Sequence, residues 1–193
     1  MYCNLLINKL PQCTSSGLKI RTDFRESIKF ELLMQDRTIS DEKKIRIILN
    51  LYYYKPEKIT DIKKALEDIL WFYKGGDRIV TDNRKKENDG NDKKKQIYSY
   101  EFDAEYIYSA FMQQYKIDLN SIRYLHWWKF RALFINLNED VLFSKIMKYR
   151  AIDLKDIKDK EMKKFYKKMK QLYALPDMRT DEEKENDFAR AFV

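Results

Sequence analysis

The chain has 193 residues, of which 44% are apolar, 15% aromatic and 36% charged, and its 39 basic and 31 acidic residues leave a formal net charge of +8. This length suits one domain or two small lobes and excludes a large multidomain enzyme, while four glycines and three prolines are too few turn residues for an all-β fold. Both signs of charge are interleaved along the sequence, which is typical of a salt-bridged helical exterior rather than of a dedicated polyanion groove.

The N-terminal segment is expected to form a small β-hairpin. Short apolar runs at 5–7 and 18–20 flank Pro11 and Gly17, which suits two short strands and a turn. The apolar run at the start has no basic residues ahead of it, so we do not expect a signal peptide. No stretch of the sequence approaches the ~18 continuous apolar residues of a membrane span.

Three helices are predicted before the first change in composition. Asp23, with Glu26 three residues later, resembles a capping box and opens the first helix. Ser40 is expected to cap the second helix and Thr60 to open the third, which the glycine pair 75–76 ends. Their apolar faces, at spacings of three and four, are Ile28, Leu32 and Leu33, then Ile45, Ile48, Leu49 and Tyr52, then Ile62, Leu66, Ile69, Leu70 and Tyr73.

A charged stretch follows at residues 82–96, which hold no large apolar side chain. Such a stretch cannot offset by burial the ~1–2 kcal/mol per residue that backbone ordering costs, so we expect a flexible linker. Lys93–Lys95 could form a basic arm, but neighbouring acidic residues favour a solvated loop. The chain is thus divided into a hairpin plus helical lobe (1–76), a charged linker (77–97), an aromatic-rich helical lobe (98–176) and an acidic tail expected to be mobile (177–193).

The aromatic-rich lobe is expected to contain four helices. Asp103 caps the first, the second runs through SIRYLHWWKFRALFINL from Ser121, and Asn138 caps the third. The fourth is basic and stops at Pro176. The second helix is apolar on two sides, as in a central helix contacted by several neighbours. The predicted fold is therefore mainly α, with helical bundle-like lobes and a small N-terminal β-hairpin, and a core shared by the two lobes is left open.

No catalytic, cofactor-binding or metal site is predicted. The only histidine, His126, lies in an apolar stretch where nothing nominates a nucleophile beside it, so we interpret it as a packed structural residue. The carboxylates lie in mixed-charge runs, and the 75–76 glycine pair lacks the spacing of a phosphate-binding loop. Cys3 and Cys13 are too sparse for a disulfide framework or a metal site and are expected to be thiols in a reducing compartment. We therefore expect a protein without enzyme activity.

Two features could contact nucleic acid or membranes. The aromatic clusters Tyr52–Tyr54 and Trp127–Trp128 could stack on bases, but successive helical residues point in different directions, which favours core packing. The basic helix before Pro176 could lie on a phosphate backbone or a membrane, yet the acidic residues near it weaken its field. Docking of this helix onto protein is therefore favoured.

Four stretches carry a family resemblance: IRTDFR at 20–25, YEFDAEYIY at 100–108, YLHWWKFRAL at 124–133 and YALP at 173–176. With them the chain resembles a family of tailed-phage morphogenesis proteins of long-tailed phages and prophages of Gram-positive bacteria. The resemblance implies a tail-module protein, encoded near the tape-measure gene, with a role similar to that of tail assembly chaperones. Such proteins coat the tape measure before tube subunits polymerise around it.

The resemblance implies that the partners are the tape-measure protein and other tail proteins, met in the host bacterial cytoplasm and not at a membrane. We expect the contact residues to be Trp127, Trp128, Tyr106 and Tyr124. The family has no established catalytic residues, so none are carried over. A minor structural protein of the mature tail, a nucleic-acid-binding module, which is less favoured, and self-association are left open.

Overall fold

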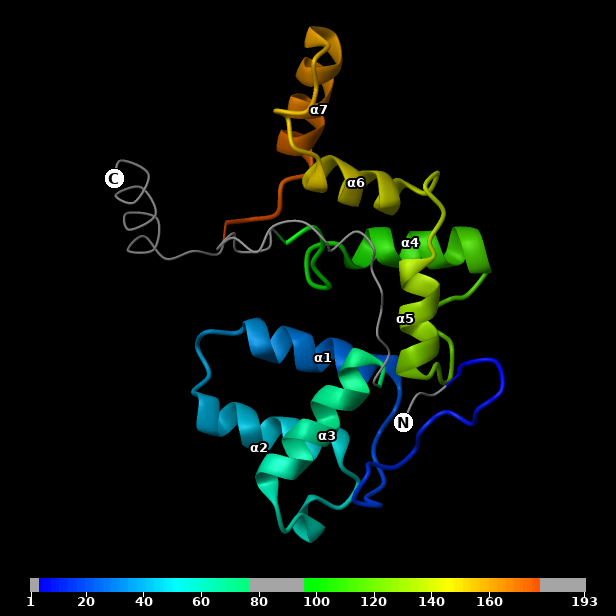
Figure 1. Ribbon diagram of the computed structural model, residues 1–193, viewed down its shortest axis with the longest axis vertical. Coiled ribbons are helices and arrows are strands. Elements are labelled where there is room, and N and C mark those ends of the chain that lie inside the picture. The colour runs from blue at the N-terminus through cyan, green and yellow to red at the C-terminus, as the bar shows by residue number, and fades with distance from the viewer. Residues whose placement is uncertain (1–3, 77–95, 178–193) are drawn as a thin grey trace.

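The computed structural model describes residues 4–76 and 96–177, and within them the chain forms seven α-helices and one short 3₁₀ helix (Figure 1). The N-terminal half contains α1 (Phe24–Gln35), α2 (Asp41–Tyr52), the 3₁₀ helix η1 (Pro56–Lys58) and α3 (Ile62–Lys74). The C-terminal half contains α4 (Ala104–Tyr115), α5 (Trp127–Ile135), α6 (Leu142–Ala151) and α7 (Lys160–Leu172). The predicted mainly α fold is confirmed.

The first three helices begin close to where the sequence predicts. The carboxylate of Asp23 accepts a hydrogen bond from the second residue of α1 at 3.1 Å, and Ser40 precedes α2. Asp61, rather than Thr60, caps α3 by accepting from its third residue at 3.0 Å. Gly75 ends α3 with a φ of 87°, a left-handed conformation that favours glycine.

The predicted N-terminal hairpin is reduced to a turn. An isolated antiparallel bridge joins Cys13 to Lys19, across a turn in which Gly17 has a φ of 77°. A second isolated bridge joins Ile20 to Tyr53, just after α2. After the turn, the Ile20 N–H donates back to the Gln12 carbonyl at 3.0 Å, while the Arg21 N–H donates to the Tyr52 carbonyl at 2.7 Å. The segment thus pairs on both sides, and no named strand forms in the described residues.

The predicted central helix is shorter than expected. The sequence predicts a helix from Ser121 onward, but α5 begins at Trp127. Before it, the backbone runs extended beside the residues that precede α1, and the Trp127 N–H donates to the Thr22 carbonyl at 2.8 Å. Since this pairing requires extended backbone, His126 becomes the N-cap of the helix.

The last two helices also differ slightly from the prediction. Val141 occupies the N-cap of α6 in place of Asn138. Asp159 caps α7 and accepts a hydrogen bond from the third helical residue at 2.7 Å. The helix ends at Leu172, four residues before Pro176, which was predicted to stop it.

α5 joins the two halves of the molecule, as its position in Figure 1 shows. Its Phe130 is fully buried and stacks on Phe24 of α1 and on Phe111 of α4, with ring centroids 4.8 and 5.0 Å apart. One cluster contains buried apolar side chains from each of the helices α1 to α6. The two predicted lobes therefore share a core.

A buried ion pair ties α4 to α6. The Arg150 guanidinium donates to both carboxylate oxygens of Asp103, at 2.6 and 2.9 Å, and to the carbonyls of Tyr173 and Ile97, at 2.6 and 3.1 Å. Asp103 holds the predicted N-cap position of α4, but its side chain makes no capping hydrogen bond. Its charge instead balances Arg150 inside the protein, where an unpaired charge is costly.

Some sequence predictions lie outside the described residues. These are most of the charged linker at 77–97, with Lys93–Lys95, the tail after Asp177, and Cys3. Across 4–76 and 96–177, no helix has the length and apolar character needed to span a membrane. In the same ranges, no three or more His, Cys, Asp or Glu side chains converge to hold a metal ion.

Candidate protein-binding site

The two tryptophans predicted as contact residues lie in the core. Trp127 and Trp128 are 2% and 1% exposed. Their indole N–H groups donate to the carbonyls of Tyr73 and Phe72, in the last turn of α3, at 2.8 and 2.7 Å. Trp127 and Trp128 thus attach α5 to the end of α3. Because both rings are buried, a partner cannot contact them in the folded chain.

The two predicted tyrosines are more accessible, but they contact different parts of the chain. Tyr124 is half exposed, and its hydroxyl shares a hydrogen bond with the hydroxyl of Thr22 at 2.7 Å. Tyr106 is partly buried on α4 and meets the ring of Tyr173 edge-on, with centroids 6.3 Å apart. The structure therefore does not bring the four residues together, and a contact role for the tyrosines stays a prediction.

His126 is a packed residue, as its apolar surroundings in the sequence indicated. Its Nδ1 accepts from the Trp128 backbone N–H at 3.1 Å, and its Nε2 lies 3.1 Å from the Pro11 carbonyl oxygen. Because a carbonyl can only accept, Nε2 carries the proton. Burial lowers the pKa of the ring below its usual value, and the positive charge of Lys129 acts in the same direction, against the hydrogen bond to Pro11.

An apolar groove lies between α1, α2 and α3, with a volume of about 340 Å³. Its floor consists of the buried side chains of Phe30, Ile48 and Ile69, one from each helix. Met34 and Leu70 stand on its rim and are about half exposed. An open apolar surface contributed by three helices is the kind of site that receives the apolar face of another helix.

Two charged side chains mark one end of the groove. Lys44, at the start of α2, donates from Nζ to the carbonyl of Met34 at 3.4 Å, and Asp41 lies one turn before it. The lysine thus joins the end of α1 to the start of α2. An apolar floor with a charged edge suits a partner that is amphipathic.

The predicted apolar faces of the second and third helices include the apolar groove residues of α2 and α3, but the face predicted for the first helix omits Phe30 and Met34, and the sequence did not predict an open groove. A signal for an open face was present, because both α2 and α3 carry neighbouring apolar pairs, Ile47–Ile48 and Ile69–Leu70. Successive helical residues point about 100° apart, so one member of each pair had to lie at the edge of the buried face. In the structure Ile47 and Leu70 are 43% and 44% exposed.

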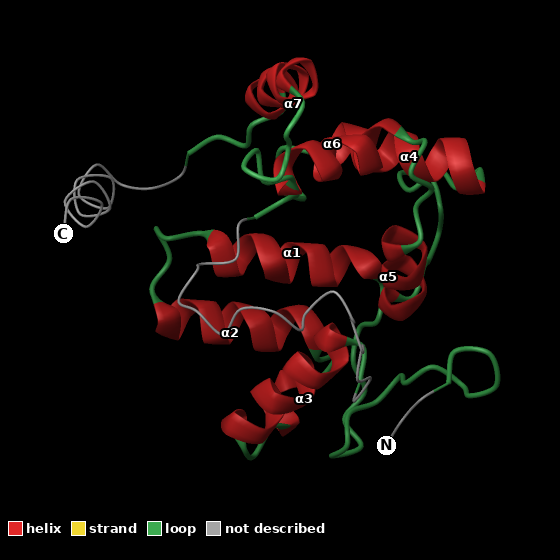
Figure 2. Ribbon diagram, turned by 45° about the horizontal axis from the view of Figure 1, so that its top comes forward, coloured by secondary structure: helices red, strands yellow, loops and turns green. Residues whose placement is uncertain are grey.

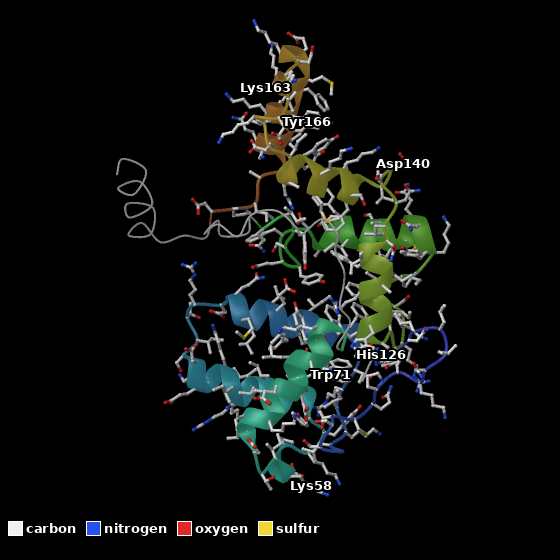
Figure 3. All side chains as sticks on the ribbon, viewed as in Figure 1. Lys58, Trp71, His126, Asp140, Lys163 and Tyr166 are labelled. Atoms are coloured by element: carbon white, nitrogen blue, oxygen red, sulfur yellow. The ribbon has the colours of Figure 1, made fainter. Side chains whose placement is uncertain are left out.

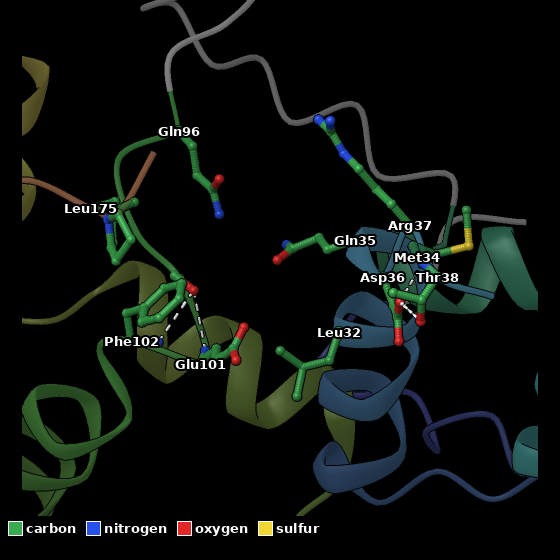
Figure 4. Close-up of a pocket in the computed structure, with 12 residues that line it drawn as sticks. Leu32, Met34, Gln35, Asp36, Arg37, Thr38, Gln96, Glu101, Phe102 and Leu175 are labelled. Atoms are coloured by element: carbon green, nitrogen blue, oxygen red, sulfur yellow. Dashed lines mark hydrogen bonds between the residues drawn. The ribbon is translucent and has the colours of Figure 1, made fainter. Parts of the chain in front are cut away.

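A second cavity, of about 800 Å³, lies between the end of α1 and the segment at 96–102 (Figure 4). Its lining is mixed and includes Leu32, Arg37, Glu101 and Phe102. At this site the Asp36 carboxylate accepts from the hydroxyl and the backbone N–H of Thr38, which lowers the pKa of the carboxyl group. The cavity borders the ends of the described ranges, whereas the groove is formed wholly by described residues.

Comparison with known proteins gives one match. The family described as "Bacteriophage Gp15 protein" matches residues 6–175, a range that contains all seven helices of the described part and ends before the predicted tail. No curated protein and no solved structure matches the chain.

Proposed function

Because the chain belongs to the bacteriophage Gp15 protein family, we propose that it is a tail assembly chaperone, which binds the tape-measure protein during tail morphogenesis. Family membership makes it a bacteriophage protein. The tail-module role rests on the resemblance carried by the LHWWKFRAL stretch. The proposed activity is binding without catalysis, in the cytoplasm of the host.

The groove between α1, α2 and α3 is the observation that carries the proposal. A long, mainly helical tape measure exposes apolar side chains until the tube encloses it, so it needs a partner that covers them for a limited time. The groove offers an apolar floor of about 340 Å³ to one face of such a helix. Because the contact area is small, binding is expected to be weak enough for tube subunits to displace the chaperone.

Co-expression with the tape-measure protein of the same phage tests the proposal. The wild-type chain is expected to co-purify with the tape measure and to raise its soluble fraction. Leu70→Asp places a charge on the half-exposed rim of the groove and should abolish co-purification without unfolding the chain. Leu142→Asp is the matched control, because Leu142 is equally exposed but lies on α6, away from the groove. No co-purification and no gain in solubility with the wild-type chain would refute the proposal.

Two alternatives are separated by further measurements. A minor structural protein of the mature tail must be present in purified virions, so mass spectrometry of virions distinguishes it from a chaperone, which leaves. A nucleic-acid-binding module is suggested by the net charge of +8 and would bind DNA with an affinity that falls steeply as salt rises. Absence of retention on DNA or heparin at low salt would exclude it.

A further inference from the structure

α7 contributes no buried side chain, although every other α-helix of the described residues buries at least three. It contacts α6 and projects beyond it in both ribbon views (Figures 1 and 2). The fold of the chain therefore does not explain why α7 is amphipathic.

The attachment of α7 uses only one of its edges. Tyr149 of α6 packs against the rings of Phe165 and Tyr166, with centroids 6.1 and 6.0 Å away. Near the base of the helix, the Lys170 ammonium donates to the Ile152 carbonyl. These contacts fix the direction of α7 and leave the rest of its surface in solvent.

An apolar strip remains open along α7. Met162, Phe165 and Leu172 are 51%, 48% and 65% exposed. At about 100° per residue, these three positions fall within an arc of roughly 80°. Exposed apolar side chains aligned in this way indicate a contact surface rather than scattered surface residues.

The remaining circumference of α7 is strongly basic. The helix carries six lysines against one glutamate, hence a net charge of +5. Five of the lysines form no ion pair with any described residue: Lys160, Lys163, Lys164, Lys167 and Lys168. Figure 3 shows Lys163 on the projecting part of the helix, far from the buried His126 and from Trp71.

We propose that α7 is a second docking surface, which takes an acidic amphipathic helix of a partner protein. At about 100° per residue, Lys168 and Lys164 follow the Leu172 edge of the strip, on the side away from Tyr166. Carboxylates of the partner would face these two lysines, and its apolar side chains would cover the strip formed by Met162, Phe165 and Leu172. The 13 residues of α7 span about 20 Å, so a partner helix of three to four turns matches its length. This surface lies at the opposite end of the molecule from the groove and does not depend on tape-measure binding.

Neither a nucleic acid nor a membrane fits α7 as well. A phosphate backbone would pair with the lysines but would leave the apolar strip in water. A membrane requires the whole apolar arc to face the lipid. On α7, however, Phe165 already packs against Tyr149, and α6 stands beside the strip.

Fluorescence anisotropy on the full chain tests the proposal. The probe is a labelled synthetic helical peptide of about 18 residues, long enough to cover α7, with a row of leucines bordered by a row of glutamates. A twin peptide with lysines in place of the glutamates, duplex DNA, and vesicles of mixed neutral and anionic phospholipid are the competing ligands. The acidic peptide is expected to bind in preference to all three, and more weakly as salt rises.

Two double variants locate the binding. Lys164→Glu with Lys168→Glu is expected to weaken binding of the acidic peptide at least tenfold, and Met162→Ser with Leu172→Ser about fivefold. Lys43→Glu with Lys63→Glu is the matched control, because it changes the net charge equally on exposed positions of α2 and α3 and should leave affinity within about twofold. Circular dichroism of each variant confirms that the helices persist.

Several results would overturn the proposal. One is an equal loss of affinity for the acidic peptide in the control and in the α7 charge variant. Another is unchanged affinity in Met162→Ser with Leu172→Ser. A third is binding of DNA or of vesicles without binding of the peptide. If a chain truncated after Asp177 bound the peptide much more tightly, the occupant of α7 would be the C-terminal segment of the chain itself. If the chain self-associated and the α7 charge reversal abolished this, the occupant would be a second copy of the chain.

Discussion

His126 is the residue at which three segments of the chain meet. Its ring donates to Pro11 in the N-terminal segment, caps α5, and meets Phe72 of α3 edge-on, with centroids 5.6 Å apart. Both ring nitrogens therefore have partners in the neutral form. Since a proton on Nδ1 would break the cap, burial and the cap together favour neutral histidine in the folded chain.

This preference predicts a loss of stability in mild acid. Burial lowers the pKa of His126 in the folded chain below 6.5, the usual value, which the unfolded chain keeps. As the pH falls through 6.5, the unfolded chain therefore binds a proton at His126 more readily than the folded chain does. The free energy of unfolding should fall as the pH drops from about 7.5 to about 5.5. His126→Asn, which keeps a capping side chain but cannot titrate there, should show a smaller drop in urea denaturation. An equal drop in both proteins would contradict this, because the chain has no other histidine.

Whereas His126 is buried in its neutral form, Arg150 and Asp103 are buried as a charged pair, and each charge is stabilised by the other. Arg150→Met removes one partner and leaves the Asp103 carboxylate buried, which should cost about 3–5 kcal/mol in the free energy of unfolding. The double variant Arg150→Met with Asp103→Asn should recover part of this loss. Lys29→Met breaks an exposed pair with Glu26 and should cost under about 1 kcal/mol. Equal effects at the two sites in chemical denaturation would refute the assignment of the buried pair as a structural tie.

At the scale of elements, the junction between α3 and α5 decides how the two halves meet. α3 ends with Gly75 and Gly76, both at positive φ, and its last carbonyls receive the indole N–H groups of α5. A side chain at Gly76 would place its Cβ 3.1 Å from the ring of Trp128, which is buried and has little freedom to move. The second glycine of the pair thus permits close packing in addition to ending a helix.

Gly76→Ala should therefore destabilise the chain more than Gly17→Ala does. Both positions have positive φ, so each alanine incurs a conformational cost of about 1 kcal/mol. At Gly17 no atom lies within 4 Å of the new Cβ, whereas Gly76→Ala must also displace Trp128. The midpoint of thermal unfolding should fall further for Gly76→Ala, with a matching change in near-ultraviolet circular dichroism from the tryptophan. Equal shifts would show that the contact with Trp128 is unimportant.

The helices could be predicted from the sequence because their signals are local. Caps such as Asp23 and apolar periodicity placed α1, α2, α3, α4 and α7 within a few residues. The start of α5 could not be predicted, because residues 121–126 have helical periodicity but their last two, Leu125 and His126, pair with the chain at the start of α1. The N-terminal hairpin is limited to one isolated bridge, Cys13 to Lys19, and its second arm also pairs with the residues that end α2. Before α5, long-range pairing of the backbone outweighed local helical propensity.

The candidate site was harder to predict than the fold. Aromatic side chains are enriched both in cores and at interfaces, so their identity alone could not separate Trp127 and Trp128 from a binding surface. Their partners, the final carbonyls of α3, lie more than fifty positions earlier in the chain. The exposed apolar residues of the groove and of α7 look like ordinary helix faces in the sequence. Only the packing of neighbouring helices shows which side of each face stays open.

At the scale of the whole molecule, one core holds α1 to α6 together and leaves α7 outside. The core cluster runs through α5 from the groove helices to α4 and α6. Breaking any of these contacts exposes apolar area on both halves, so we expect α1 to α6 to unfold cooperatively. α7 exposes little new apolar surface when it opens, because it buries no side chain fully.

Hydrogen exchange should therefore separate α7 from the rest of the chain. Amides of α7 are expected to exchange through local opening, with rates that hardly change in low denaturant, whereas those of α5 should exchange only through global unfolding. Tyr149→Ala removes the ring that contacts Phe165, Tyr166 and Tyr173 and should speed exchange in α7. Leu142→Asp, an exposed change on the same α6, should leave α7 unaffected. If α7 and α5 were equally protected, α7 would belong to the cooperative core.

An acidic partner bound to α7 should slow exchange there and leave α5 unchanged, because the two regions open independently.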